Sequence, residues 1–173
     1  MIAGDTYRRE FTAGNMYGPD PDQSHWLQLG EVNENHLRQR AVGFNCLNFD
    51  RDENEGTLYR HYMPDKDYIT ANCISGLRAE LAFPSCWNGD LTSENHKDHM
   101  AYTSLILDGD CPDSHPYRLP LLLYETVWAV AAFAKRNGSF IWSNGDTTGK
   151  WRDEFERVTY CWTNETHRPR LSW

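Results

Sequence analysis

Two histidines three positions apart offer the first candidate chemistry in this chain. The segment 94–99, Glu-Asn-His-Lys-Asp-His, contains His96 and His99, a spacing that puts both imidazoles on one side of a helical turn. Imidazole can bind a metal ion or accept a proton near neutral pH, so the pair could serve either chemistry. The alternative is a polar loop whose histidines bond to the backbone, and this spacing alone does not separate the two.

A second candidate lies in the segment 111–120, where prolines stiffen the backbone around His115 and Arg118. The planar guanidinium of Arg118 offers paired donors for a carboxylate or for sugar hydroxyls, and His115 could contribute to the same site. The competing interpretation is an arginine bound to a structural carboxylate. Both interpretations stay open at this point.

Three carboxyl groups stand in surroundings that could make them acids or bases. Asp5 and Glu125 lie in largely apolar or aromatic stretches, where burial would raise the pKa of a carboxyl group into the range of a general acid. Asp146 lies in a glycine-flanked turn. Ion pairs with Arg8 or Arg118 are the structural alternative.

Composition limits the classes of partner. The chain has 173 residues, of which 39% are hydrophobic and 13% aromatic, as expected of one folded domain. Its net charge of −8 would repel phosphate backbones and anionic membrane surfaces, so we expect no nucleic-acid partner. No apolar run is long enough to predict a membrane span.

The pattern of apolar residues predicts strands. Alternation in 40–49 and 76–83 is typical of half-buried strands, while 14–26 is rich in Gly, Pro and Asp and predicts an exposed loop. Further strands are predicted at 99–109 and 139–145, and 121–135 favours a strand through Trp128 over a short helix. Short strands without a helix of convincing length indicate a mainly β fold, an antiparallel β-sandwich or jelly roll.

Cysteine usage and two acceptor sequences suggest an extracellular protein. None of the five cysteines forms a C-x-x-C pair, so disulfides are favoured over a zinc or thioredoxin-like site. Asn137-Gly-Ser and Asn164-Glu-Thr are acceptors for N-linked glycans, usable only in a secretory compartment. The start, Met-Ile-Ala-Gly-Asp, has no signal-peptide character, which conflicts with the other two features.

Several segments together resemble a known family. In order along the chain, GFNCLNF, FPSCW, NHKDHMAY and CPDSHPYRLP resemble the DUF1996 domain of secreted fungal proteins. The resemblance covers about residues 1–155 and leaves 156–173 as a divergent tail. It implies a secreted protein with a polysaccharide-related role, and it puts His96, His99, His115, Arg118 and Asp146 in signature segments.

Three hypotheses follow from this resemblance. The first is a carbohydrate-active protein that cleaves a polysaccharide, with Trp87, Tyr102 and Trp142 as platforms for stacking sugars. A glycoside hydrolase would need two carboxyl groups about 5–5.5 Å apart for retention or about 6.5–9.5 Å for inversion, and Asp146 with Asp5 or Glu125 is the candidate pair. A lyase would instead use His96 as the base and Arg118 to neutralise the substrate carboxylate. The second is a noncatalytic module that binds cell-wall glycans through the same aromatic residues. The third is a metal site built from His96, His99 and an upstream segment. No cofactor is expected.

Departures from the family pattern shape the remaining expectations. The family has an upstream segment with two more histidines, and Arg152 stands where a histidine is expected. We therefore expect the C-terminal part of an incomplete domain, inactive as an enzyme. The resemblance also implies that four cysteines form two disulfides, in any of three connectivities, and that Cys161 stays unpaired. These four are Cys46, Cys73, Cys86 and Cys111.

Overall fold

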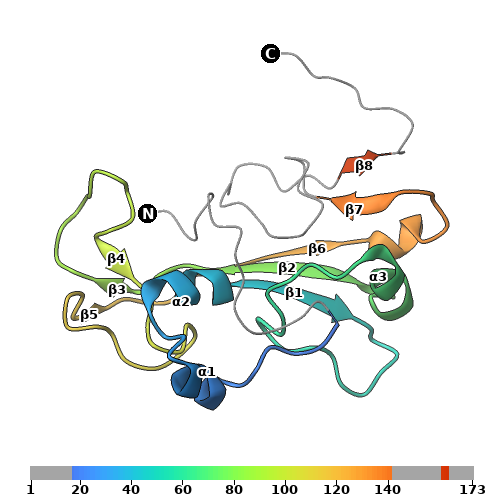
Figure 1. Cartoon of the computed structure of the whole chain (residues 1–173). Coiled ribbons are helices and arrows are strands. Elements are labelled where there is room, and N and C mark those ends of the chain that lie inside the picture. Colours follow the sequence, from blue (N-terminus) through green and yellow to red (C-terminus); the bar gives the residue numbers. More distant parts are fainter. Residues whose placement is uncertain (1–16, 142–160, 164–173) are drawn as a thin grey trace, which may run out of the picture.

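The largest sheet has three antiparallel strands. The computed structural model describes residues 17–141 and 161–163, and in it β1 (Val42–Leu47), β2 (Gly76–Ala82) and β6 (Leu123–Trp128) pair in the order β1-β2-β6. Figure 1 shows them as one layer through the middle of the molecule. These strands confirm the alternation in the sequence and the end of the third strand at Trp128.

A glycine allows the central strand β2 and the outer strand β6 to approach closely. Gly76, at the start of β2, has φ +135°, and a side chain there would meet Val127 Cγ1 at 2.9 Å and the carbonyl oxygen of Trp128 at 3.1 Å. Any other residue would therefore be strained in its backbone and would also push β6 away.

Helices are present but short. They are α1 (Gln23–Leu29), α2 (Glu34–Arg40), α3 (Lys66–Asn72) and the 3₁₀ helix η1 (Val130–Phe133). The side chains of Asp22, Asn33 and Asp65 accept backbone N–H bonds at the starts of α1, α2 and α3. The predicted loop at 14–26 is therefore wrong at its end, since α1 begins within it and Trp26 is buried.

The second sheet is much smaller. It contains β3 (Cys86–Trp87), β4 (Met100–Ala101) and β5 (Tyr117–Arg118) in the order β4-β3-β5. The predicted strand at 99–109 is thus only two residues long, and turns follow it, with Ile106 at φ 65°. A further pair joins β7 (Ser139–Ile141) to β8 (Cys161–Thr163).

Two hydrophobic clusters form the interior. The first packs one face of the large sheet against α3 and η1, and the second joins α1 and α2 to the loop after β4. Members of the first include Phe44, Ile69, Leu77 and Val130; members of the second include Trp26, Leu37, Ala82 and Tyr102.

The other face of the large sheet is covered by a chain segment rather than by a second sheet. Asn45 and Glu80, which alternation assigns to the polar side, are 0% and 3% exposed. The Leu58 amide donates to Glu80 Oε2 at 2.6 Å, and the Tyr59 amide donates to Asn45 Oδ1 at 3.2 Å. Because residues 54–60 cross here, both faces of β1 are buried.

The predicted sandwich or jelly roll is therefore not what the described residues form. Antiparallel pairing is confirmed, but the fold is mixed, with small separate sheets and short helices in place of two facing sheets. The physical reason is the cover on the polar face, where loop amides donate to one oxygen each of Glu80 and Asn45. The incompleteness of the domain stays a prediction.

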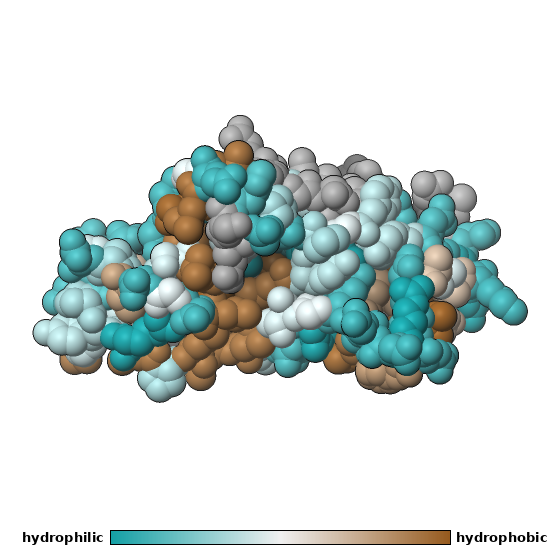
Figure 2. Space-filling view, turned by 90° about the horizontal axis from the view of Figure 1, so that it is seen from below, coloured by the Kyte–Doolittle hydropathy of each residue, from teal (hydrophilic) through white to brown (hydrophobic). Residues whose placement is uncertain are grey.

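Within the described part of the chain, no helix is long and apolar enough to cross a membrane. Aliphatic side chains are nevertheless exposed. Helix α1 lies lowest in Figure 1, on the face that Figure 2 shows, where apolar surface lies between hydrophilic areas; Leu27 and Leu29 of α1 are 59% and 48% exposed. Scattered aliphatic exposure of this kind is ordinary and by itself indicates no ligand.

Candidate functional site

Some of the predicted site residues lie outside the part of the chain that the structure describes. They are Asp5, Trp142, Asp146 and Asn164. The predicted pairing of Asp146 with Asp5 or Glu125 therefore stays a prediction. The remaining candidates can be placed.

The two histidines of the first candidate lie in turns, not in a helix. His96 is exposed and has φ 57°, whereas His99 is 8% exposed, with Nδ1 3.0 Å from Ser93 Oγ. Their environments thus differ sharply, as the loop interpretation expects. Across residues 17–141 and 161–163, no cluster of three or more His, Cys, Asp or Glu could hold a metal ion.

His115 and Arg118 bond to backbone carbonyl groups. Nε2 of His115 donates to the carbonyl oxygen of Asp98 at 3.0 Å, and Nη1 of Arg118 donates to that of Gly109 at 2.7 Å. Each side chain ties its own segment to a loop distant in sequence. These contacts give both residues a structural role, although Arg118 stays exposed and could use its other donors.

Glu125 lies beside a carboxyl group that the sequence analysis did not select. Glu80 is its direct partner across β2 and β6, and the two carboxyl groups share a hydrogen bond. Nε of Arg78 lies 2.9 Å from Glu80 Oε1 and 3.4 Å from Glu125 Oε1. One guanidinium therefore serves two carboxyl groups, of which Glu80 is buried and Glu125 is 41% exposed.

Burial raises the pKa of Glu80 to about 7, with the hydrogen bond to Glu125 adding to this effect and the Leu58 amide and Arg78 opposing it. Gly43 leaves room for this carboxyl group, because a Cβ there would lie 2.5 Å from Glu80 Oε2. The pair can hold a proton near neutral pH. However, hydrogen-bonded carboxyl groups are closer than the ~5 Å that a glycosidase needs between them.

The buried charge of Arg40 and the buried side chain of His61 are also structural. Arg40, 1% exposed, ion-pairs with Asp20 and Glu31 and lies 4.1 Å over the ring of Trp26. His61 Nδ1 bonds to the same Asp20. The charges are paired, as buried charges must be, and they join α1 and α2 to the chain around His61.

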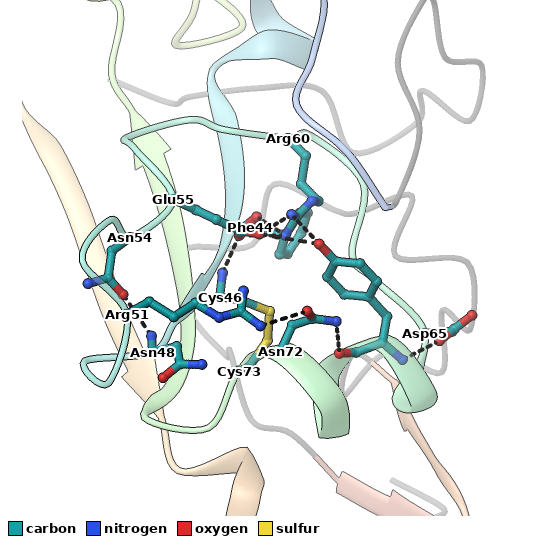
Figure 3. The surroundings of a disulfide bond; sticks show 11 residues. Phe44, Cys46, Asn48, Arg51, Asn54, Glu55, Arg60, Asp65, Asn72 and Cys73 are labelled. Carbon is teal, nitrogen blue, oxygen red and sulfur yellow. Dashed lines mark hydrogen bonds and ion pairs between the residues drawn. A yellow bond between two sulfur atoms is a disulfide. The ribbon is translucent and has the colours of Figure 1, made fainter.

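Arg60 is the other fully buried arginine, and it lies near a disulfide. Figure 3 shows its guanidinium bonded to the carboxylate of Glu55, which also accepts the Cys46 amide. Tyr68 of α3 accepts from Arg60 at 3.1 Å. This network fixes residues 54–60 along the edge of β1 that does not pair with β2.

The four predicted cysteines form two disulfides, Cys46–Cys73 and Cys86–Cys111. This selects one of the three connectivities. Such bonds persist in oxidising compartments, which indicates an extracellular setting.

The predicted sugar platforms separate into one buried and one partly exposed residue. Tyr102 is 2% exposed, and its hydroxyl donates to the carbonyl oxygen of Ala82 at 3.0 Å, so no ligand can stack on its ring in this fold. Its place is in the core because it packs with α1 and α2. Trp87, in contrast, is partly exposed on the small sheet.

A second aromatic residue, absent from the sequence-based candidates, lies beside Trp87. Tyr117 of β5 is its cross-strand partner, 56% exposed, with ring centroids 5.7 Å apart and planes tilted by 48°. Met100 of β4 pairs with Trp87 on its other side. Because directly paired residues share a face, the three form a row across the sheet, from buried Met100 to exposed Tyr117.

The side chain of Trp87 is held firmly. The indole N–H of Trp87 donates to the carbonyl oxygen of Asp90, and Asn88 and Asp90 bond to each other across a turn at Gly89. The Cys86–Cys111 bond is adjacent to Trp87. The ring orientation is therefore set before any ligand arrives.

Comparison with known proteins identifies the family of the chain and gives no activity or ligand. The chain matches no curated protein and no solved structure. The model of the domain of unknown function DUF1996 matches residues 1–152, which confirms the resemblance seen in the sequence. The chain thus belongs to the DUF1996 domain family.

Proposed function

We propose that this chain is an extracellular glycan-binding module without catalytic activity. The observation that carries the proposal is the pair of Trp87 and Tyr117 on one face of the small sheet, with the indole of Trp87 fixed by a hydrogen bond and Tyr117 56% exposed. Rigid aromatic side chains provide a large contact area at low cost in conformational entropy, and their faces suit the apolar side of a pyranose ring.

Polar groups suited to sugar hydroxyls surround the pair. Asp90 is exposed next to the indole, and Asn88 is partly exposed in the same turn. Carboxylate and amide groups of this kind can accept and donate hydrogen bonds at the rim of an aromatic platform. The net charge of −8 disfavours acidic polysaccharides, so neutral wall polysaccharides are the expected ligands.

Binding is favoured over cleavage by the geometry of the carboxyl pair that contains the candidate Glu125. Glu80 and Glu125 share a hydrogen bond, and Glu80 is 3% exposed, so the two cannot stand on opposite sides of a glycosidic bond. A lyase built on His96 and Arg118 is also disfavoured, since His96 is exposed in a turn and Arg118 donates to the carbonyl oxygen of Gly109.

The test is a binding assay with a chemical readout in parallel. The full chain is incubated with neutral and acidic polysaccharides, and bound protein is measured together with reducing ends and unsaturated products. We expect saturable binding to at least one neutral polysaccharide and no product. Trp87→Ala should abolish binding, and Tyr117→Ala should weaken it about tenfold or more, equivalent to about 1.4 kcal/mol.

Tyr124→Ala is the matched control. The exposed fraction of Tyr124, 47%, is similar to that of Tyr117, but Tyr124 lies on β6 of the large sheet. Equal losses for Tyr117→Ala and Tyr124→Ala would contradict the proposal, as would binding that survives Trp87→Ala. Release of reducing ends or unsaturated products by the wild-type chain would contradict the proposal and indicate that the protein cleaves the polysaccharide.

A further inference from the structure

The turn that follows η1 carries an acceptor sequence for N-linked glycosylation. Asn137 and Gly138 end the connection from η1 to β7, Ser139 is the first residue of β7, and both Asn137 and Ser139 are exposed. The middle residue is not proline, and the third carries the required hydroxyl group. An acceptor asparagine must lie on the surface, and this one does.

The neighbours of Asn137 keep the turn outside the core. The Arg136 amide donates to the carbonyl oxygen of Phe133 at 2.9 Å, and the Arg136 carbonyl accepts from Lys66 Nζ of α3. Gly138 has φ +119°, so the chain reverses immediately after the asparagine. Phe140, 6% exposed, then anchors β7 in the large hydrophobic cluster. A glycan on Asn137 would extend from an anchored turn and displace no core side chain.

The disulfides are an independent observation that points to the same compartment. Cys46–Cys73 and Cys86–Cys111 form in the oxidising lumen in which eukaryotic cells also attach N-linked glycans. A chain that acquires both bonds there presents the Asn137 sequence to the glycosylation machinery.

From these observations we infer that Asn137 is an N-glycosylation site. A bond forms between Asn137 Nδ2 and the anomeric carbon of an oligosaccharide. The donor is a lipid-linked oligosaccharide diphosphate: its sugar–phosphate bond breaks, the lipid diphosphate leaves, and the amide nitrogen loses one proton. No electrons are transferred in this step.

The attached glycan would lie far from the aromatic pair. In Figure 1 the small sheet of β3, β4 and β5 is at one end of the molecule, and η1, α3 and β7 are at the other. Modification at Asn137 should therefore leave Trp87 and Tyr117 accessible. The inference does not depend on the proposed glycan binding, and its test uses a different readout.

The experiment expresses the full chain behind an added secretion signal in a eukaryotic host, with a cell-free translation supplemented with microsomes as a second system. Peptide mapping before and after removal of N-linked glycans measures occupancy at Asn137. We expect most Asn137-containing peptide to carry a glycan. Ser139→Ala should abolish this signal without touching the asparagine, and Ser139→Thr, which keeps the acceptor sequence, should retain it.

Two changes serve as internal comparisons. Asn164→Gln removes the other acceptor sequence and should leave the Asn137 peptide modified, and Asn35→Gln, at an exposed asparagine outside any acceptor sequence, should change nothing. Unmodified Asn137 in both systems would overturn the inference. So would a Ser139→Ala protein that keeps the same glycan on Asn137.

Discussion

The two three-stranded sheets of this protein have different structural roles. The large sheet pairs strands of six or seven residues, buries both faces of β1, and encloses ionisable groups such as the carboxyl group of Glu80. The small sheet has strands of two residues, a disulfide at its centre and aromatic side chains at its surface. The comparison indicates that the large sheet maintains the fold, and the small sheet, fixed by a covalent bond, presents side chains to solvent.

The largest effect is expected from a substitution in the core of the large sheet, which tests whether this sheet maintains the fold. Leu77 of β2 is 0% exposed and lies in the first hydrophobic cluster. Leu77→Ala should lower the free energy of unfolding by about 2–5 kcal/mol, because it removes buried contacts and leaves a cavity. Urea denaturation measures this, with Leu91→Ala as the control, since Leu91 is 87% exposed. A similar loss for both variants would mean that Leu77 is not in a packed core.

A smaller effect is expected when the disulfide of the small sheet is removed. Replacing Cys86 and Cys111 together by Ser should cost about 3 kcal/mol, given the sequence separation of 25. The small sheet should lose more order than this loss of global stability suggests, since two-residue strands without the disulfide cannot hold the Trp87–Tyr117 pair in place. Near-UV circular dichroism should show the aromatic signal diminish while the urea transition persists. An unchanged aromatic signal would argue that the disulfide does not order this sheet.

The effect that is smallest per pH unit concerns the buried carboxyl group of the large sheet. The pKa of Glu80 is raised to about 7 from an ordinary value of 4.5, so between these pH values the folded chain holds a proton that the unfolded chain has released. This contribution to stability is fully present below about pH 4.5 and is lost as the pH rises toward 7. The slope should be at most about 1.4 kcal/mol per pH unit.

Variants separate the contribution of Glu80 to the pH dependence of stability from the contributions of other titrating groups. Glu80→Gln should remove the slope relative to the wild type. Glu125→Gln should only shorten the pH window, because burial, the larger cause of the raised pKa of Glu80, is unchanged. Denaturation midpoints measured between pH 4 and 8 test this. Identical profiles for wild type and Glu80→Gln would show that the carboxyl group is not buried as described.

Sequence patterns predicted the strands of the large sheet better than any other feature. Alternation located β1 and β2 because their apolar residues contribute to one continuous cluster. The helices were missed because each has only seven residues, about two turns, too few for a clear periodicity. The capping residues Asp22, Asn33 and Asp65 were the available signal.

The candidate site was less accessible to sequence reasoning because it depends on pairing between distant segments. Glu125 was identified, but Glu80 was not, since its burial comes from residues 54–60 crossing the sheet. Trp87 was identified, but Tyr117 lies thirty positions away and becomes its neighbour only through the pairing of β3 with β5. Tyr102 was assigned to the surface because the pattern did not show that α1 and α2 cover it.

The order of the disulfides along the chain has a consequence for biosynthesis. The first bond joins residues 46 and 73 and the second joins 86 and 111, so the two loops are consecutive and do not interleave. In a chain that enters an oxidising lumen from its N-terminus, Cys73 follows Cys46 before Cys86 or Cys111 does, so the native partner of Cys46 is the first that it can reach. Vectorial synthesis by itself therefore favours the native partners, and neither bond needs an isomerase to exchange it for the other.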